Sequence, residues 1–154
     1  MNIKIRKATE IDFPVVLSLI KELAVFERDA DKVTNSVALM KEEQEYFLCF
    51  LAEDENREVV GMALCFFAYY TWVGKSLYLE DIYVKEQYRS HKVGTSLLRK
   101  VFEIAREENC KRVRWQVLDW NTSAIEFYRK SGAEINSKWL NCTFDKDGIL
   151  NFNL

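Results

Sequence analysis

Two adjacent carboxylates, Glu80 and Asp81, lie inside a run of large apolar residues from Leu77 to Val84. Neighbouring strand residues point to opposite faces, so we expect one of the pair to enter a cleft on a sheet face. A poorly solvated carboxylate has a raised pKa and can accept a proton, directly or through a water molecule. The pair is therefore a candidate general base. The alternative is a pair satisfied by backbone groups or by a lysine such as Lys75.

A second candidate site is the basic turn from Arg89 to Thr95, which opens an amphipathic helix. Backbone N–H groups at a helix N-terminus point outward, and the helix dipole favours an anion there. His91 and Lys92 would add positive charge beside a bound phosphate. A basic, solvated helix start without a ligand is the alternative.

Hydrophobic patterning predicts the elements that must position both sites. Apolar residues recur at helical spacing in segments that we expect to form helices at 12–27, 36–45, 93–109 and 121–131. Strand-like runs predict strands at 3–8, 46–52, 58–70, 76–84, 113–118, 138–144 and 149–152. Asp12 and Asn121 are expected to cap their helices, and Gly132 is expected to end the last one.

The order of these elements predicts the sheet. Turns at Asn56 and Gly74 would make three successive strands antiparallel, whereas a helical crossover would make strand 113–118 parallel to strand 76–84. We therefore expect a mixed α/β fold with a mostly antiparallel central sheet, one parallel crossover and helices on both faces. Open sheets of this kind bind ligands where their strand ends splay.

Composition narrows the class of protein. A length of 154 residues fits one domain, 1–154. The net charge of −2 argues against nucleic-acid or membrane-surface binding. Four cysteines without a CxxC pair, and a single histidine, argue against a metal site. The longest apolar run, 62–70, is too short to span a bilayer, and no signal-peptide core follows Met1, so we expect a cytoplasmic protein.

Three segments, in this order and spacing, resemble the GNAT superfamily of N-acetyltransferases: Leu77 to Val84, Tyr88 to Leu98, and Trp120 to Tyr128 with the following Ser131 to Ala133. Within it the chain looks like the spermidine/spermine N-acetyltransferase group. The thialysine N-acetyltransferase branch looks most similar, because of Thr71 to Lys75 and the pair Leu118 and Asp119. The resemblance implies a GNAT-like fold and direct acetyl transfer from acetyl-CoA to a primary amine of a diamine-like, polyamine-like or lysine-like molecule.

The resemblance also implies roles for individual residues. Glu80 matches the catalytic glutamate, and Tyr128 matches a tyrosine that protonates the departing CoA thiolate. The positions that would hold the cofactor are Ile82, Tyr83 and Val84 after a strand bulge, the loop Arg89, Ser90, His91, Lys92, Val93, Gly94 and Thr95, and Asn121, Ala124 and Tyr128. Ser90 and Lys92 replace glycines of the family loop, so a weaker cradle and a compensating positive charge are both possible outcomes.

The same resemblance implies an amine pocket. Its positions are Phe26, Glu27, Tyr70, Trp72, Glu80, Arg114, Trp115 and Gln116. Tyr70 stands where the polyamine enzymes carry an aspartate, and the segment between Gly132 and Trp139 is shorter than theirs. Both departures favour an amine shorter than spermine. The aromatic residues could form a cation–π wall, or simply belong to the core or to a dimer interface.

Three further expectations follow. The relatives imply a homodimer, for which the tail from Ile149 would be suited. A protein lysine, a protein N-terminus or an aminoglycoside is the alternative acceptor. A degenerate acyl-CoA-binding domain without catalysis is the alternative function, because of the missing loop glycines.

Overall fold

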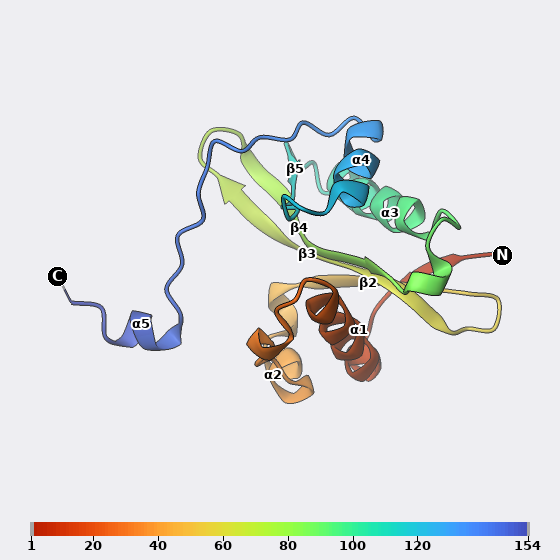
Figure 1. The fold of residues 1–154 in the computed structure, drawn as a ribbon, viewed down its shortest axis with the longest axis horizontal. Coiled ribbons are helices and arrows are strands. Elements are labelled where there is room, and N and C mark those ends of the chain that lie inside the picture. Colours follow the sequence, from red (N-terminus) through yellow and green to blue (C-terminus); the bar gives the residue numbers. More distant parts are fainter. Residues whose placement is uncertain (1, 154) are drawn as a thin grey trace. The chain divides into compact units, whose positions relative to one another are not determined.

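The structure is a computed structural model that describes residues 2–153, and the chain forms two compact units, Met1–Gln116 and Val117–Leu154. The first unit contains a five-stranded sheet whose spatial order follows the sequence (Figure 1). Its strands are β1 (Lys4–Lys7), β2 (Leu48–Glu53), β3 (Val59–Tyr70), β4 (Gly74–Val84) and β5 (Val113–Arg114). The first three pairings are antiparallel and β4 pairs with β5 in parallel, which confirms the predicted mixed sheet.

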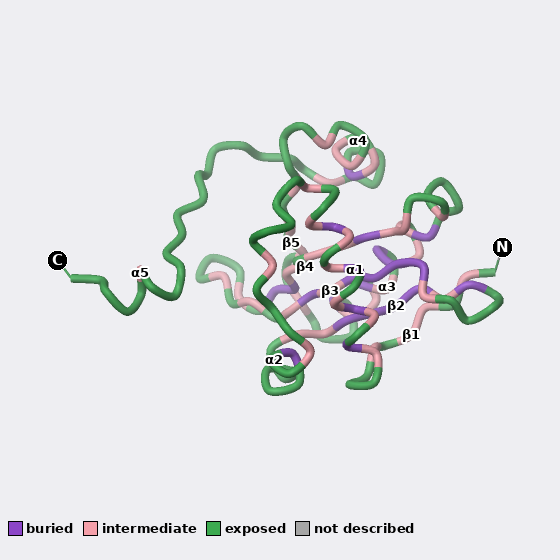
Figure 2. The backbone as a smooth tube through the Cα atoms, turned by 60° about the horizontal axis from the view of Figure 1, so that its bottom comes forward, coloured by how far each residue is buried: buried purple, intermediate pink, exposed green. Residues whose placement is uncertain are grey.

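Helices pack on both faces of this sheet (Figure 1). Helices α1 (Phe13–Phe26) and α2 (Val37–Glu42) bury Val16, Leu19 and Met40 against one face, and α3 (Val93–Glu107) covers β2, β3 and β4 on the other. Short 3-10 turns occupy Glu10–Asp12, Ala30–Lys32, Gln44–Tyr46 and Glu86–Tyr88. The strand β2 and the first half of β3 are buried on both faces, which is why they read as continuous apolar runs (Figure 2).

Asp12 precedes α1 as expected, but its carboxylate does not cap the helix. It accepts hydrogen bonds from the Arg6 guanidinium at 2.7 and 2.8 Å and from the Thr9 N–H at 2.7 Å. Arg6 also donates to Glu53 at 2.6 Å, so one guanidinium joins β1, β2 and the start of α1. A bidentate charged pair holds this carboxylate more strongly than a helix N–H would.

The expected strand at 113–118 forms only at Val113 and Arg114. These residues pair with Leu77 and Tyr78. Beyond Tyr78, no strand among residues 2–153 pairs with this edge of β4. The pairing of β3 with β4 shifts register just beyond this point, between Leu64 and Cys65. A bulge bends the strand that contains it, so β4 leaves the line of β5.

The second unit contains α4 (Thr122–Lys130) and α5 (Lys146–Leu150). Gly132 follows α4 with a φ of 89°, as expected of a helix stop. The strands expected at 138–144 and 149–152 were wrong, because residues 133–145 have no regular structure and the next segment is helical. The Asp145 carboxylate caps that helix by accepting from Gly148 N–H at 2.8 Å, whereas a strand would need an edge to pair with.

Within residues 2–153, none of the helices combines the length and the apolar character that crossing a membrane requires.

Candidate active site

A β-bulge places the two carboxylates of the predicted base. Leu64 lies opposite Asp81 and Cys65 lies opposite Leu79, so Glu80 is the extra residue on β4. Asp81 is half-buried beside Leu64, which packs on the α1 face, while the Glu80 side chain is exposed. Because a bulge breaks strict alternation, the simple expectation of opposite faces does not apply here.

The pair belongs to a cluster of three carboxylates on the α1 face. Burial, followed by the charges of Glu80 and Glu27, raises the pKa of Asp81 to about 6. Burial, followed by the charges of Asp29 and Glu80, also raises the pKa of Glu27. Lys75, the alternative partner for the pair, instead binds Glu108 at 2.6 Å. Glu27, Glu80 and Asp81 therefore form an acid cluster, in which the raised pKa of Asp81 suits that carboxylate to accepting a proton near neutral pH.

Within the described part of the chain, no three or more His, Cys, Asp or Glu side chains are arranged to hold a metal ion.

Aromatic rings border the acid cluster. Phe26 ends α1 next to Glu27, and the Arg89 guanidinium lies 5.0 Å from its ring centroid. The Tyr83 hydroxyl donates to Glu22 on α1 at 3.2 Å, which ties the end of β4 to that helix. Tyr78 stacks on Phe66 with centroids 5.1 Å apart. These contacts hold the aromatic side chains of α1, β3 and β4 in place on this face of the sheet.

Two of the remaining residues expected in the amine pocket are in contact, and the other three are placed differently. Tyr70 and Arg114 are in contact, with the guanidinium 5.6 Å from the ring centroid. Trp115 is half-buried, and its place next to Arg114 on an extended segment directs it to the opposite face. Gln116 is exposed at the end of the first unit. Trp72 is 86% exposed at the tip of the β3–β4 hairpin, so the structure does not bring it to the acid cluster.

The basic turn has the backbone that a glycine loop would have. Ser90 and Lys92, the two residues that replace family glycines, have φ values of 67° and 62°. A left-handed conformation costs a non-glycine residue about 1–2 kcal/mol, so neighbouring contacts must hold this shape. The contacts include Arg89 Nε donating to Val84 O at 3.1 Å and a 2.9 Å hydrogen bond between His91 Nδ1 and Arg89 O. The turn therefore adopts the glycine-type geometry without the glycines.

The first turn of α3 fits a phosphate group. Its N-cap residue, Lys92, makes no side-chain capping bond, so the first N–H groups of the helix keep their donor capacity. An added Cβ on Gly94 would lie 3.9 Å from Val84 Cγ2, which places this turn beside the end of β4. Val93 is buried there and Thr95 is exposed.

The edge of β4 offers main-chain groups next to that turn. Among residues 2–153, no strand pairs with this edge beyond Tyr78. Ile82, Tyr83 and Val84 pair with β3 on one side only, so alternate N–H and C=O groups of this segment point away from β3. An extended chain of amides, such as a pantetheine arm, could pair with such an edge.

Asn121, Ala124 and Tyr128 belong to the second unit. Asn121 Oδ1 accepts from Ala124 N–H at 3.2 Å, which confirms the predicted cap of α4. Tyr128 is buried, and its ring centroid lies 5.4 Å from that of Phe127.

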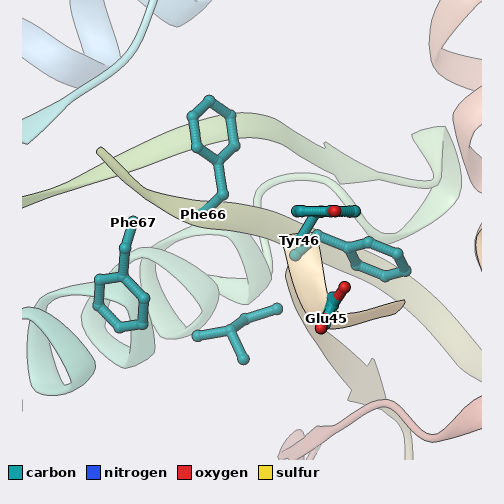
Figure 3. A pocket seen from close by; sticks show the side chains of 6 residues that line it. Glu45, Tyr46, Phe66 and Phe67 are labelled. Atoms are coloured by element: carbon teal, nitrogen blue, oxygen red, sulfur yellow. The ribbon is translucent and has the colours of Figure 1, made fainter. Parts of the chain in front are cut away.

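A separate hollow of about 210 Å³ lies where β2 begins (Figure 3). Its lining is mostly aromatic, and Phe66 and Phe67 point to opposite sides of β3. None of the expected catalytic or cofactor residues lines it; the lining residues are Glu45, Tyr46, Phe47, Leu48, Phe66 and Phe67.

Sequence reasoning gave Asp81 only as one of a pair and did not single out Arg112, whose guanidinium lies 5.3 Å from the Tyr70 ring centroid. The raised pKa of Asp81 depends on the bulge, and the position of Arg112 depends on how β5 meets β4. Neither has a local sequence signal.

Known proteins resemble this chain over most of its length. A model of the acetyltransferase (GNAT) family matches residues 13–133. The thialysine N-epsilon-acetyltransferase of Mus musculus is 36% identical over 160 residues, covering 95% of this chain and 94% of that protein. The enzyme of the same name from Bos taurus is 38% identical over 143 residues, covering 86% and 84%.

A solved aminoglycoside acetyltransferase from an uncultured soil metagenomic sample superposes with a TM-score of 0.77 at 24% identity, covering 93% of this chain and 97% of that one. At that identity the likeness shows the fold alone. The family match includes the bulged β4, the basic turn and α4. With these features present, the chain belongs to the acetyltransferase (GNAT) family.

Proposed function

We propose that this acetyltransferase transfers an acetyl group from acetyl-CoA directly to a primary amine of a small lysine-like or polyamine-like molecule. The observation that carries the proposal is the acid cluster beside the bulge in β4, next to the turn that opens α3. Two thialysine N-epsilon-acetyltransferases of similar length and 36–38% identity support this acceptor class.

Acetyl-CoA, when bound, supplies the acetyl group as a thioester, so that a new N–C bond forms as the C–S bond breaks and CoA leaves as its thiol. The first turn of α3 and the side chains of His91 and Lys92 would bind the pyrophosphate. The β4 edge at Ile82 to Val84 would hold the pantetheine amides and polarise the acetyl carbonyl through a main-chain N–H.

The acid cluster prepares the acceptor. An ammonium group must lose a proton before its nitrogen can attack, and Glu80 is the exposed carboxylate placed to accept that proton. Asp81 is the neighbouring, half-buried carboxylate, and its burial, followed by the charges of Glu80 and Glu27, raises its pKa to about 6. Tyr128 would return a proton to the departing thiolate, since a phenol remains protonated at neutral pH.

The proposal extends to the whole chain. Residues 1–154 would form one catalytic domain, because the family match runs from the first unit into the second. A homodimer is supported by the apolar residues exposed in the C-terminal tail. A cytoplasmic location is supported by four free cysteines, as expected in a reducing compartment.

The test is CoA-thiol release with acetyl-CoA and a panel of thialysine, lysine, ornithine, putrescine, spermidine and spermine. We expect turnover with at least one short amine, and losses of about 10²- to 10⁴-fold in Glu80→Gln and Tyr128→Phe. Glu107→Gln, an exposed carboxylate at the end of α3, is the matched control and should retain wild-type turnover. Unchanged turnover in both active-site variants would reject the assigned roles.

A further inference from the structure

Two arginines stack on one tyrosine, Tyr70, at the end of β3. The guanidinium carbons of Arg112 and Arg114 lie 5.3 and 5.6 Å from the Tyr70 ring centroid. The two arginines are two residues apart on an extended segment, so they point to the same side. The aromatic ring therefore holds two positive charges close together, in fixed orientations.

Both guanidiniums remain available to an anion. Across residues 2–153, neither Arg112 nor Arg114 has a carboxylate within ion-pair distance, although seven such pairs occur elsewhere in that range. Both side chains are exposed. Two neighbouring cations without a counter-ion repel each other, and a bound anion would relieve that repulsion.

These arginines and the acid cluster share one face of the sheet. Arg114 lies directly opposite Tyr78 in the β4–β5 pair, and cross-strand partners point to the same side. Burial and then the charge of Glu80 raise the pKa of Tyr78, while Arg114 lowers it, so its hydroxyl lies near both charges. Glu80 is two residues beyond Tyr78 on β4, about 7 Å along a strand.

Resting on the proposed function, we propose that Arg112 and Arg114 bind the carboxylate of the acceptor while the acid cluster receives its terminal ammonium. The substrate class is then an α-amino acid with a primary amine at the end of its side chain, rather than a diamine or polyamine.

The same charges select against polyamines. A guanidinium binds a carboxylate with two parallel hydrogen bonds, which is stronger than a neutral contact. A polyamine would instead bring a second ammonium to the arginines and meet repulsion there. Tyr70 contributes by positioning the two guanidiniums, and it adds no negative charge that could bind a second ammonium.

The experiment compares acceptors that differ only at the carboxylate. Lysine is paired with cadaverine, ornithine with putrescine, and lysine with lysinamide. For the wild type we expect kcat/KM to be about 10- to 100-fold higher for the carboxylate member of each pair. The difference should reside mainly in KM, because the carboxylate lies away from the reacting nitrogen.

Arg112→Gln and Arg114→Gln, singly and together, should lower the lysine-to-cadaverine ratio of kcat/KM, with the double variant near unity. Arg114→Lys should restore part of the ratio. Arg106→Gln, an exposed arginine in the last turn of α3, should leave the ratio at the wild-type value. A general folding defect would lower both rates together and would not move the ratio.

The outcomes separate this inference from the proposed function. Equal rates for each pair, with ratios that do not respond to either arginine, would overturn carboxylate recognition and leave amine acetylation intact. The absence of acetylation with every amine would overturn the proposed function itself. A ratio below unity that rises in Arg114→Gln would show that the arginines exclude the carboxylate.

Discussion

At the scale of single residues, the proposed chemistry depends on the β-bulge at Glu80, which shifts the pairing of β3 with β4 by one residue. The sequence identifies Glu80 and Asp81 as a carboxylate pair, but their environments follow from the bulge that leaves Glu80 unpaired against β3. At the bulge, Leu64 pairs with Asp81 and Cys65 pairs with Leu79. This register depends on both strands, so the sequence of β4 alone does not predict it. The positive φ of Ser90 and Lys92 is equally invisible, because both types usually favour negative φ.

Asp81 should lower the free energy of unfolding at every pH above about 6, neutral pH included. Its pKa rises from 3.8 to about 6 on folding, so the folded state binds the proton more tightly and loses stability as the pH rises through about 6. Asp81→Asn should therefore raise the free energy of unfolding by about 2 kcal/mol at pH 8, with no gain below about pH 4.

Urea denaturation at pH 4, 6 and 8 measures this difference. The same variant should lose the acid limb near pH 6 in the pH profile of kcat/KM. A constant difference in stability between pH 4 and pH 8 would contradict the raised pKa.

Lys92 should have two opposing effects. Its positive charge should strengthen acetyl-CoA binding, whereas its left-handed backbone should lower the free energy of unfolding. Lys92→Glu should weaken acetyl-CoA binding about tenfold, because it places a negative charge at the N-terminus of α3 beside the phosphate. Lys92→Gly should raise stability by about 1 kcal/mol, since glycine adopts its φ of 62° without strain. Calorimetric titration and urea denaturation separate the two effects; equal affinity in Lys92→Glu would remove this turn from the cofactor site.

At the scale of elements, the predicted helices and the first four predicted strands are present, whereas the three predicted strands after residue 112 are shortened or absent. The helices α1 and α3 and the strands β3 and β4 lie within a few residues of their predicted bounds, because each buries a continuous apolar face. The strands expected at 138–144 and 149–152 rested on alternation alone, and alternation does not supply a partner edge. The expected strand at 113–118 ended after two residues for a related reason, because β4 bends away.

Arg6 should be the main polar tie between the N-terminal elements. It bonds Asp12 and Glu53, and it holds the pKa of Asp12 well below its usual range. Arg6→Met should lower the free energy of unfolding by about 2–3 kcal/mol at pH 7, because two partly buried carboxylates lose their common partner.

That loss should shrink as the pH falls below about 4, since the unfolded chain then binds a proton at Asp12 that the folded wild type, with its lowered pKa, does not bind. Arg99→Met, an exposed arginine on α3, is the control and should change stability by less than about 0.5 kcal/mol. An equal loss in both variants would assign the effect to general surface charge.

At the scale of the whole molecule, the C-terminal tail carries more exposed apolar surface than a solvated segment needs. Six large apolar side chains between residues 139 and 152 are more than half exposed: Trp139, Leu140, Phe144, Ile149, Leu150 and Phe152. Such a surface marks an interaction site, and a second copy of the chain is the occupant that the proposed homodimer supplies.

We expect a dimer in sedimentation velocity at micromolar concentration. Leu140→Asp combined with Leu150→Asp should shift it to a monomer, because both charges would be buried in the interface. Thr143→Asp is the matched control, as it adds charge to the same tail without replacing an apolar side chain. A wild-type monomer across the concentration range would reject the dimer.

The most direct test of the central claim is identification of the product. The protein is incubated with acetyl-CoA and either thialysine or lysine, and tandem mass spectrometry locates the acetyl group while the CoA thiol is counted. We predict one acetylated terminal amine for each thiol released, with both signals reduced together in Glu80→Gln. Release of thiol without an acetylated amine, or acetylation that is indifferent to Glu80, would contradict the account.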